Sequence, residues 1–251
     1  MSRKHDALGI DIGGSGIKGA PVDLDKGCFA EDRLRIATPE EATPEAVCDV
    51  VEQVAEHFAV NTDVPLGITL PAVVTHGVVR SAANIDRSWV GLDADALFGQ
   101  RLGRPVHLVN DADAAGVAER HYGAAKGEKG LVILTTLGTG IGSALLLDGH
   151  LVPNSELGHL EIEGHDAESR AAESVREREG LDTARWAERL QTYYSHLESI
   201  FWPDLIVVGG GVSKQADTFL PLLDLRTPIV PAKLRNKAGI IGAARLAARG
   251  N

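Results

Sequence analysis

Two glycine-rich segments about half a chain apart follow nearly the same pattern, and this repeat constrains the fold more than any other feature of the sequence. The first reads Ile10-Asp-Ile-Gly-Gly-Ser-Gly-Ile-Lys-Gly-Ala20, and the second reads Thr136-Leu-Gly-Thr-Gly-Ile-Gly-Ser-Ala144. Each passes from apolar residues through glycines and hydroxyl residues back to apolar residues, which predicts a strand, a tight turn and a second strand. The repeat therefore predicts a duplicated α/β protein with a cleft between its two copies.

The other segments alternate between short apolar runs and stretches with helical spacing. The apolar runs predict strands covered on both faces, over 7–12, 17–23, 64–70, 106–109, 131–135, 143–147 and 205–208. Helical spacing predicts helices over 44–59, 93–102, 113–122, 173–200 and about 239–248, with a capped helix starting at Ser213. We expect an N-terminal α/β domain over 1–111 and a C-terminal α/β domain over 112–251, with the helix of about 239–250 packing back on the first.

Composition excludes several classes of protein. The chain has 251 residues, of which 44% are hydrophobic, enough to form a core without the support of disulfide bonds or structural metals. Its net charge of −10 argues against a nucleic-acid partner and against docking on an anionic membrane surface. Residues 130–147 carry no charge, but their glycines and threonines predict two short strands rather than a membrane span. The two cysteines, Cys28 and Cys48, cannot form a cysteine-rich metal site. We expect a soluble, cytoplasmic protein.

The glycine turns are candidate phosphate cradles, because a backbone without Cβ atoms lets consecutive N–H groups approach one anion. The alternative is that they are only tight hairpins. The interleaved hydroxyl groups and a third glycine run favour phosphate binding. Neither a Walker loop nor a Rossmann loop fits, since no Gly-Lys-Ser/Thr follows and a strand, not a helix, comes next. The candidate residues are Gly13, Gly14, Ser15, Gly16, Thr136, Gly138, Thr139, Gly140, Gly210 and Gly211.

Two charged residues flank the first turn. Asp11 lies within an apolar strand, where an acid is costly unless it faces a cleft or a cation. It is a candidate for organising Mg²⁺ through water, and the alternative is a hydrogen-bonded structural carboxylate. Lys18 is placed to reach a phosphate, although a lone lysine is more often simply solvated.

Asn110 and Asp111 follow a predicted buried strand, at the strand end where α/β sheets place ligands. The carboxylate of Asp111 could take a proton from a sugar hydroxyl while Asn110 orients that sugar. The alternative is an Asx turn that caps the next helix.

In this context the chain resembles the ROK family of sugar kinases and regulators, and within it the bacterial polyphosphate glucokinases. The segments that carry the resemblance span nearly the whole chain in family order. They are 9–19, Ala82-Ala-Asn-Ile-Asp-Arg-Ser-Trp89, Val109-Asn-Asp111, 136–144, Pro153-Asn-Ser-Glu-Leu-Gly-His-Leu-Glu161, Gly164-His-Asp-Ala-Glu168 and Val208-Gly-Gly-Gly-Val-Ser-Lys214.

The resemblance implies duplicated actin-like or hexokinase-like (ribonuclease H-like) domains and assigns roles to individual residues. Asp111 would be the general base on the 6-hydroxyl of glucose. The remaining hydroxyls would be held by Asn84, Asn110, Glu156, His159 and Glu168. It also implies a homodimer.

The chain departs from the family pattern at two places. Residues 160–167 contain no cysteine, whereas most ROK kinases carry a C-x-C-G-x-x-G-C zinc motif there, so a structural zinc of that type cannot form. Polyphosphate glucokinases share this departure. The second is Ala72 in Leu70-Pro-Ala72, where the subfamily reads Phe-Pro-Gly. Glycine adopts a positive φ readily, whereas alanine does so only at a cost in free energy.

We therefore expect phosphoryl transfer from polyphosphate, and from ATP as a further donor, to glucose. Residues 226–237 carry Arg226, Lys233, Arg235 and Lys237 without an acid, either as a phosphate track or as an ordinary solvated loop. The alternatives are a strictly ATP-dependent hexokinase for glucose or mannose, a sugar-sensing repressor and an actin-like filament protein. A repressor needs a helix-turn-helix module, for which a first strand near residue 7 leaves no room.

Overall fold

A computed structural model gives the arrangement of the chain and describes residues 5–82 and 85–249. Contacts divide the chain into two compact units, Met1–Ala118 with Lys237–Asn251, and Glu119–Asn236. This division lies inside helix α3 (Asp111–Tyr122) rather than at 111, because the first turns of α3 pack with residues of the first unit.

The first sheet contains the first glycine hairpin. Its strands are β1 (Ala7–Gly13), β2 (Gly16–Asp23), β3 (Cys28–Phe29), β4 (Leu34–Ile36), β5 (Leu66–Leu70) and β8 (His107–Asn110), in the order β3-β2-β1-β5-β8 with β4 also on β2. β1 and β2 are antiparallel, whereas β1, β5 and β8 are parallel. The carboxyl ends of the parallel strands therefore lie at one edge of the sheet, and the hairpin tip lies at that edge.

The second sheet repeats this topology. Its strands are β9 (Leu131–Leu137), β10 (Ile141–Leu147), β11 (His150–Val152), β14 (Leu205–Gly210) and β15 (Ile229–Pro231), in the order β11-β10-β9-β14-β15. Here too the first two strands form an antiparallel hairpin and the later strands run parallel to the first. The duplication predicted from the glycine repeat is confirmed.

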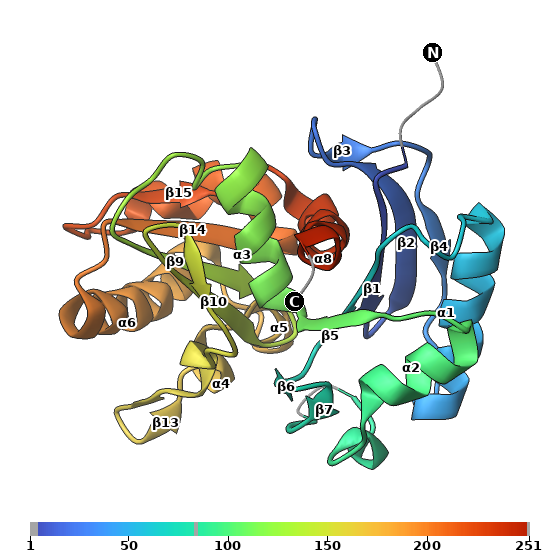
Figure 1. Ribbon diagram of the computed structural model, residues 1–251. Helices are drawn as coiled ribbons and strands as arrows, with labels where there is room; N and C mark the ends of the chain where they lie inside the picture. The colour runs from blue at the N-terminus through green and yellow to red at the C-terminus, as the bar shows by residue number, and fades with distance from the viewer. Residues whose placement is uncertain (1–4, 83–84, 250–251) are drawn as a thin grey trace. The chain divides into compact units, whose positions relative to one another are not determined.

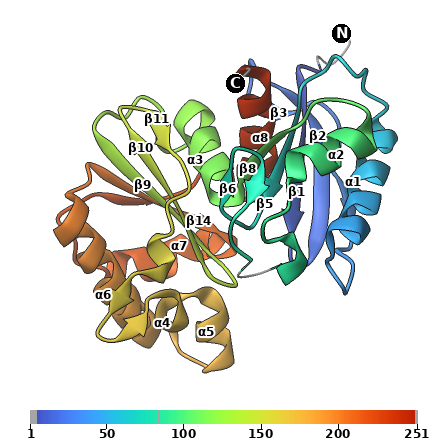
Figure 2. The ribbon, with the colours of Figure 1, turned by 60° about the horizontal axis from the view of Figure 1, so that its bottom comes forward.

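Helices cover both faces of the first sheet (Figures 1 and 2). α1 (Pro44–Phe58) begins at the capping hydroxyl of Thr43 and packs its apolar stripe on one face, with α2 (Ala94–Leu102) beside it. On the opposite face lies α8 (Ala238–Arg249), so close that a Cβ on Gly9 or Gly67 would overlap its backbone carbonyls. The last helix of the chain thus completes the first unit.

The second sheet packs against α6 (Thr183–Phe201), whose buried face includes Trp186, Leu190 and Tyr194. The prediction of one helix over 173–200 is wrong. The chain forms α5 (Glu173–Arg178), turns at Gly180 with φ +61°, and starts α6 from the capping carboxylate of Asp182. Glycine after a helix and aspartate before the next are ordinary end signals.

The capped helix expected from Ser213 is also wrong. The segment forms the 3₁₀ turn η3 (Gly211–Gln215), the single helical turn α7 (Ala216–Phe219) and a second 3₁₀ turn, η4 (Leu220–Leu222). Pro221 lies inside that last turn and lacks the N–H that a continuing α-helix requires.

The remaining elements are short. β6 (Val74–Thr75) pairs with β7 (Val78–Val79), and β12 (Glu161–Ile162) pairs with β13 (His165–Asp166). η1 (Arg87–Trp89), η2 (Leu157–His159), η5 (Arg235–Lys237) and the short helix α4 (Glu168–Ala171) complete the chain. Among the described residues, no helix combines the length and the apolar character needed to cross a bilayer.

Candidate active site

The first glycine hairpin joins β1 to β2 through Gly14 and Ser15. The N–H groups of these two residues have no hydrogen-bond partner within 5–82 and 85–249. A Cβ built on Gly14 would meet no atom within 4 Å. Two adjacent, unpaired N–H groups beside open space are what an anion nest requires.

The hairpin tip is held from the side by a residue that the sequence analysis did not single out. Arg35 of β4 donates from Nη2 to the carbonyl oxygen of Ser15, at 2.6 Å. A Cβ on Gly16 would lie 2.7 Å from Nε of Arg35, so glycine at this position makes room for the guanidinium. Thr38 also donates its hydroxyl to the Gly13 carbonyl oxygen. The hairpin is therefore preorganised by side chains of its own unit.

A row of polar side chains crosses the first sheet behind the hairpin. Strand register pairs Arg35 with Lys18, Lys18 with Asp11 and Asp11 with Thr69. Thr69 donates its hydroxyl to Asp11 Oδ1 at 2.8 Å, and Lys18 Nζ lies 3.5 Å from Asp11 Oδ2. The row thus contains two cations and one carboxylate, which leaves positive charge beside the hairpin.

Asp11 is hydrogen-bonded, as the structural alternative predicts, and its side chain is still partly exposed. A single carboxylate cannot supply the octahedral shell of Mg²⁺, and no group of three metal ligands around it is found among the described residues. Asp11 fits a magnesium ion held through water and through donor phosphates.

A cavity of about 440 Å³ lies beside the first hairpin within the first unit. Gly13, Gly14 and Trp89 form part of its wall, and the acidic residues on it are Glu40, Glu41 and Asp86. Its volume is in the range of sites for small molecules.

The second hairpin is bonded to the helical segment that follows it. Ser174 donates its N–H to the Gly138 carbonyl (3.1 Å) and its hydroxyl to the Thr139 carbonyl (2.6 Å). The Ile141 N–H donates to Glu168 Oε2 at 2.9 Å, and a Cβ on Gly140 would overlap that carboxylate. The N–H groups of Thr139 and Gly140 have no partner in the described part of the chain. Both hairpins therefore present two adjacent unpaired donors.

The third glycine run has a different environment. Gly210 has φ +81°, and a Cβ there would overlap the backbone of Leu137 on the neighbouring strand. A Cβ on Gly211 would lie 3.3 Å from Glu173 Oε2, and burial raises the pKa of the Glu173 carboxyl. An acid beside Gly211 suits hydroxyl groups better than phosphate. Thr136 lies opposite Gly209 and Gly142, in the strands rather than in the turn.

Asn110 and Asp111 lie where β8 passes directly into α3. Asn110 is buried, and its Oδ1 accepts the N–H groups of Ala112 (2.9 Å) and Asp113 (3.1 Å), so it forms the Asx cap that was the alternative to a sugar ligand. Its Nδ2 donates to the Ala72 carbonyl at 3.1 Å. The half-buried Asp111 accepts the Ala112 N–H at 2.8 Å through one oxygen.

Ala72 is one of the departures from the family pattern, and its φ is not positive. The alanine therefore fits without strain, and the positive φ values of its loop lie at His76 (+51°) and Gly77 (+77°). Asn84 lies outside the described residues.

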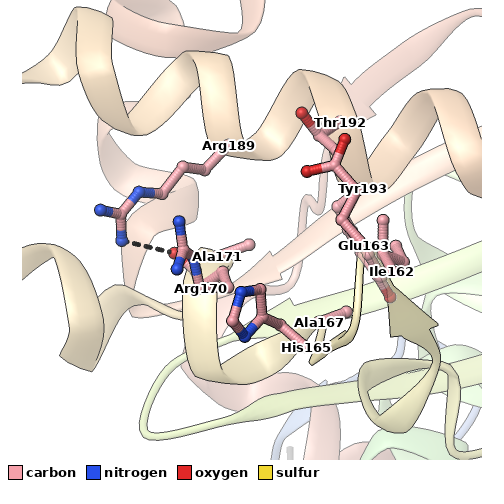
Figure 3. Close-up of a pocket in the computed structure, with 9 residues that line it drawn as sticks. All are labelled: Ile162, Glu163, His165, Ala167, Arg170, Ala171, Arg189, Thr192 and Tyr193. Atoms are coloured by element: carbon pink, nitrogen blue, oxygen red, sulfur yellow. Dashed lines mark hydrogen bonds between the residues drawn. The ribbon is translucent and has the colours of Figure 1, made fainter.

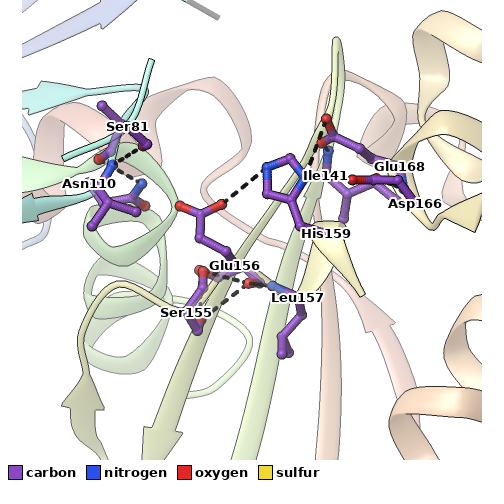
Figure 4. Close-up of polar contacts among 12 residues, drawn as sticks. Ser81, Asn110, Ile141, Ser155, Glu156, Leu157, His159, Asp166 and Glu168 are labelled. Atoms are coloured by element: carbon purple, nitrogen blue, oxygen red, sulfur yellow. Dashed lines mark hydrogen bonds and ion pairs between the residues drawn. The ribbon is translucent and has the colours of Figure 1, made fainter. Parts of the chain in front are cut away.

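Figure 4 shows the polar cluster of the second unit, in which Glu156, His159 and Glu168 come together. His159 Nε2 lies 3.9 Å from Glu156 Oε2, and Nδ1 lies 4.0 Å from Glu168 Oε1. The turn is set by Ser143, which accepts the Leu157 N–H, and by Gly158, where a Cβ would overlap the Ile141 carbonyl.

The electrostatics of this cluster come from four ionisable groups. The pKa of His159 is raised, first by its hydrogen bond to Asp166 and then by the charges of the nearby carboxylates. Burial raises the pKa of the Glu156 carboxyl, although His159 acts against that shift. Carboxylates and an imidazole in one half-buried cluster can accept and donate hydrogen bonds to several hydroxyl groups at once.

Three of these side chains are also close enough for a metal ion. The ligand atoms of His159, Asp166 and Glu168 lie within 4.8 Å of one another. The described part of the chain places no thiolate there, since Cys28 and Cys48 are free thiols of the first unit. Burial raises the pKa of Cys48 to about 12, so that thiol stays protonated.

Sequence reasoning missed Arg35, Thr69 and Asp166. Asp166 lay inside a segment quoted for the family resemblance but received no role. Arg35 and Thr69 had no local signal, because only strand register brings them to Lys18 and Asp11.

Known proteins resemble this chain over most of its length. The ROK family model matches residues 7–174. The polyphosphate glucokinase of Mycobacterium tuberculosis (strain CDC 1551 / Oshkosh) is 52% identical over 97% of this chain and 91% of its own length. The chain belongs to the ROK family.

Solved structures of ROK proteins share the fold. The inorganic polyphosphate/ATP-glucomannokinase from Arthrobacter sp. strain KM superposes with a TM-score of 0.96 and 55% identity, covering 99% of this chain and 100% of that chain. A ROK family glucokinase from Streptomyces griseus, in complex with glucose and AMPPNP, gives a TM-score of 0.84 at 25% identity, covering 97% and 99%. The duplicated actin-like fold expected from the sequence is therefore confirmed.

Proposed function

We propose that this protein transfers a phosphoryl group from inorganic polyphosphate to the 6-hydroxyl of glucose, with ATP as a second donor. The observation that carries the proposal is the pair of glycine hairpins, each with two adjacent unpaired N–H groups. Two such pairs of donors suit a chain of phosphates better than a single anion. The names of the relatives in Mycobacterium and Arthrobacter support the same donor and acceptor.

In the proposed reaction, the glucose O6 attacks the terminal phosphorus in line and its proton passes to the Asp111 carboxylate. The bond from that phosphorus to the bridging oxygen breaks, and polyphosphate shortened by one phosphate leaves. Positioning and electrostatic stabilisation dominate such transfers. Mg²⁺, held by Asp11 through water and by the donor, would neutralise the charge on the transferring group.

Residues of the two hairpins would bind the donor. The first hairpin would bind it through Gly13, Gly14, Ser15 and Gly16, together with Lys18. The second hairpin would bind it through Gly138, Thr139 and Gly140. Arg35 joins this set because it is in register with Lys18 and has no carboxylate partner among the described residues. The acid beside Gly211 suits the ribose hydroxyls of a nucleoside, which supports ATP as the second donor.

Glu156, His159 and Glu168 would bind glucose hydroxyls, together with Asn84 and the remaining Nδ2 hydrogen of Asn110. The Arthrobacter relative is named a glucomannokinase. We therefore propose mannose, which differs from glucose at one hydroxyl, as a second acceptor.

The family resemblance further supports a homodimer in the cytoplasm. Light scattering on the purified protein tests the dimer, because a dimer has twice the 26.6 kDa of the chain.

The candidate phosphate track at 226–237 is not part of the proposal. The Arg226 guanidinium stacks over the Trp202 ring, 3.8 Å from its centroid, and lies 3.9 Å from Glu198. Lys237 lies over the Phe29 ring. These contacts engage two of the four cations and favour the alternative of an ordinary surface loop.

The deciding assay measures glucose 6-phosphate formed from polyphosphate and from ATP, with and without Mg²⁺. We expect product from both donors, more at low donor concentration from polyphosphate, and loss of product without Mg²⁺. Product from ATP alone would leave the alternative of a strictly ATP-dependent hexokinase. An ATPase rate that is unaffected by glucose would instead favour an actin-like nucleotide-binding protein.

A further inference from the structure

Asp166 lies on the small β12–β13 hairpin and contacts His159. Its Oδ2 lies 2.9 Å from His159 Nδ1, and its Oδ1 accepts the Glu168 N–H at 3.2 Å. Its main-chain carbonyl also accepts the Ser169 hydroxyl at 2.6 Å. The carboxylate is therefore held in place at the start of α4 while it faces the imidazole (Figure 4).

We propose that Asp166 is a positioning residue of the sugar site, whose carboxylate accepts the Nδ1–H of His159 and so presents Nε2 to a hydroxyl group of the bound hexose. This inference rests on the proposed function. A histidine ring has two chemically distinct nitrogens, and a fixed partner on one nitrogen decides which hydrogen bond the other can make.

The other acids of the cluster cannot replace Asp166 without losing contacts of their own. Glu168 Oε1 is 4.0 Å from the same nitrogen, beyond hydrogen-bond distance, and the other oxygen of Glu168 accepts the Ile141 N–H. Glu156 faces Nε2, not Nδ1, at 3.9 Å. Among the described residues, Asp166 is the one acid within hydrogen-bond distance of His159 Nδ1.

The neighbouring residues of the hairpin have different surroundings. His165 and Glu163 line a cavity of about 80 Å³ together with Arg170, Arg189 and Tyr193 (Figure 3). Within the described part of the chain, neither makes a hydrogen bond or an ion pair with His159, so these residues provide matched controls on the same hairpin. Glu163→Gln removes one carboxylate charge from the hairpin, as Asp166→Asn does.

The test compares Asp166→Ala, Asp166→Asn and Glu163→Gln by steady-state kinetics at pH 7.5. For Asp166→Ala we expect the KM for glucose to rise roughly tenfold, the size of effect seen when a partner that orients a histidine is removed. The KM for polyphosphate should stay within twofold, because the hairpins keep their contacts. Asp166→Asn should recover much of the glucose KM, since its side-chain oxygen still accepts the Nδ1–H, and Glu163→Gln should match the parent.

A second readout follows the His159 ring directly. NMR titration should show a lower His159 pKa in Asp166→Asn than in Glu163→Gln, because the amide keeps the hydrogen bond but loses the charge. The charged groups around the ring are Glu156, Glu168 and Asp166, and the control leaves all three intact.

The outcomes separate the two proposals. A parent protein that phosphorylates no hexose would refute the proposed function, while the NMR comparison would still test the Asp166–His159 contact. The positioning role would be refuted if folded Asp166→Ala kept the parent's KM for glucose. It would also be refuted if the KM for glucose and the KM for the donor rose equally. An unchanged His159 pKa in Asp166→Asn would refute it as well.

Discussion

The Asn110 side chain already has three partners, two helix N–H groups and one carbonyl oxygen. Its neighbour Asp111 starts α3, where a negative charge interacts favourably with the positive end of the helix. The two residues therefore have different roles at this strand end. Asn110 fixes the passage from strand to helix, and that passage sets the position of Asp111, the proposed base.

Asp111→Asn tests the base. We expect kcat to fall by roughly 10²–10⁴, because the amide cannot accept the proton of the 6-hydroxyl. Glucose affinity measured by calorimetry should change by no more than a few-fold, since the amide has nearly the same shape. The matched control is Asp217→Asn, an exposed change on α7, which should leave kcat unchanged. Near-normal turnover of Asp111→Asn would remove Asp111 from the role.

His159 should also make stability depend on pH. Its pKa is raised in the folded protein, first by the hydrogen bond to Asp166. The charged ring therefore contributes stability fully below about pH 6.5, the unfolded value, and this contribution is lost as pH rises through the folded pKa. The free energy of unfolding in urea, measured from pH 5.5 to 8.5, should differ most between parent and His159→Asn at the acidic end. A difference that grows with pH would contradict this.

At the scale of elements, the glycines of the two hairpins have different structural reasons. Gly16 and Gly140 make room for Arg35 and Glu168, whereas a Cβ on Gly14 or Gly138 would meet nothing within 4 Å. Neither Gly14 nor Gly138 has a positive φ. Alanine at Gly14 or Gly138 would therefore be tolerated by the fold and would obstruct only a ligand.

Gly138→Ala separates donor binding from folding. We expect the unfolding free energy to stay within ~0.5 kcal/mol of the parent, as for surface changes without contacts. The KM for polyphosphate should rise about tenfold, which corresponds to ~1.4 kcal/mol of lost binding. Gly140→Ala serves as the comparison, because its Cβ would overlap Glu168 and should also raise the glucose KM. Unchanged donor KM in Gly138→Ala would argue against a phosphate at this turn.

The sequence predicted the elements whose signals are local. Glycines flanked by apolar runs marked both hairpins, and Thr43 with Pro44 marked the start of α1. The break between α5 and α6 was missed, although Gly180 and Asp182 carry its signal, because the apolar spacing continues across it. The pairing of β2 with β4 and of β1 with β5 could not be predicted, because each pair is separated by intervening chain and has no local signal.

At the scale of the molecule, α8 joins the last residues to the first strand. Gly9 and Gly67 allow the helix to touch the sheet, and a Cβ on Gly242 would overlap the Ala114 carbonyl of α3. Such spacing leaves no room for one added methyl group in a packed interior. The first unit is thus built from both ends of the chain.

Gly242→Ala and Gly99→Ala should change the stability of the fold in opposite directions. Each replaces glycine in a helix, which alone should gain up to ~1 kcal/mol. At Gly99 the nearest atom to the new Cβ is 3.6 Å away, so stability should rise. At Gly242 the overlap should outweigh that gain, with a net loss of about 1–3 kcal/mol. Thermal unfolding of both variants checks this, and a stabilised Gly242→Ala would show that α8 packs less closely than described.

The position of α8 also has a consequence for protein synthesis. While the ribosome makes residues 1–237, one face of the first sheet has no helix to cover it, including the surfaces of Gly9 and Gly67. The second unit, which is continuous in the chain, is complete before that face is covered. The nascent protein therefore carries an open apolar surface until α8 has been made, and such transiently exposed surfaces are prone to aggregate.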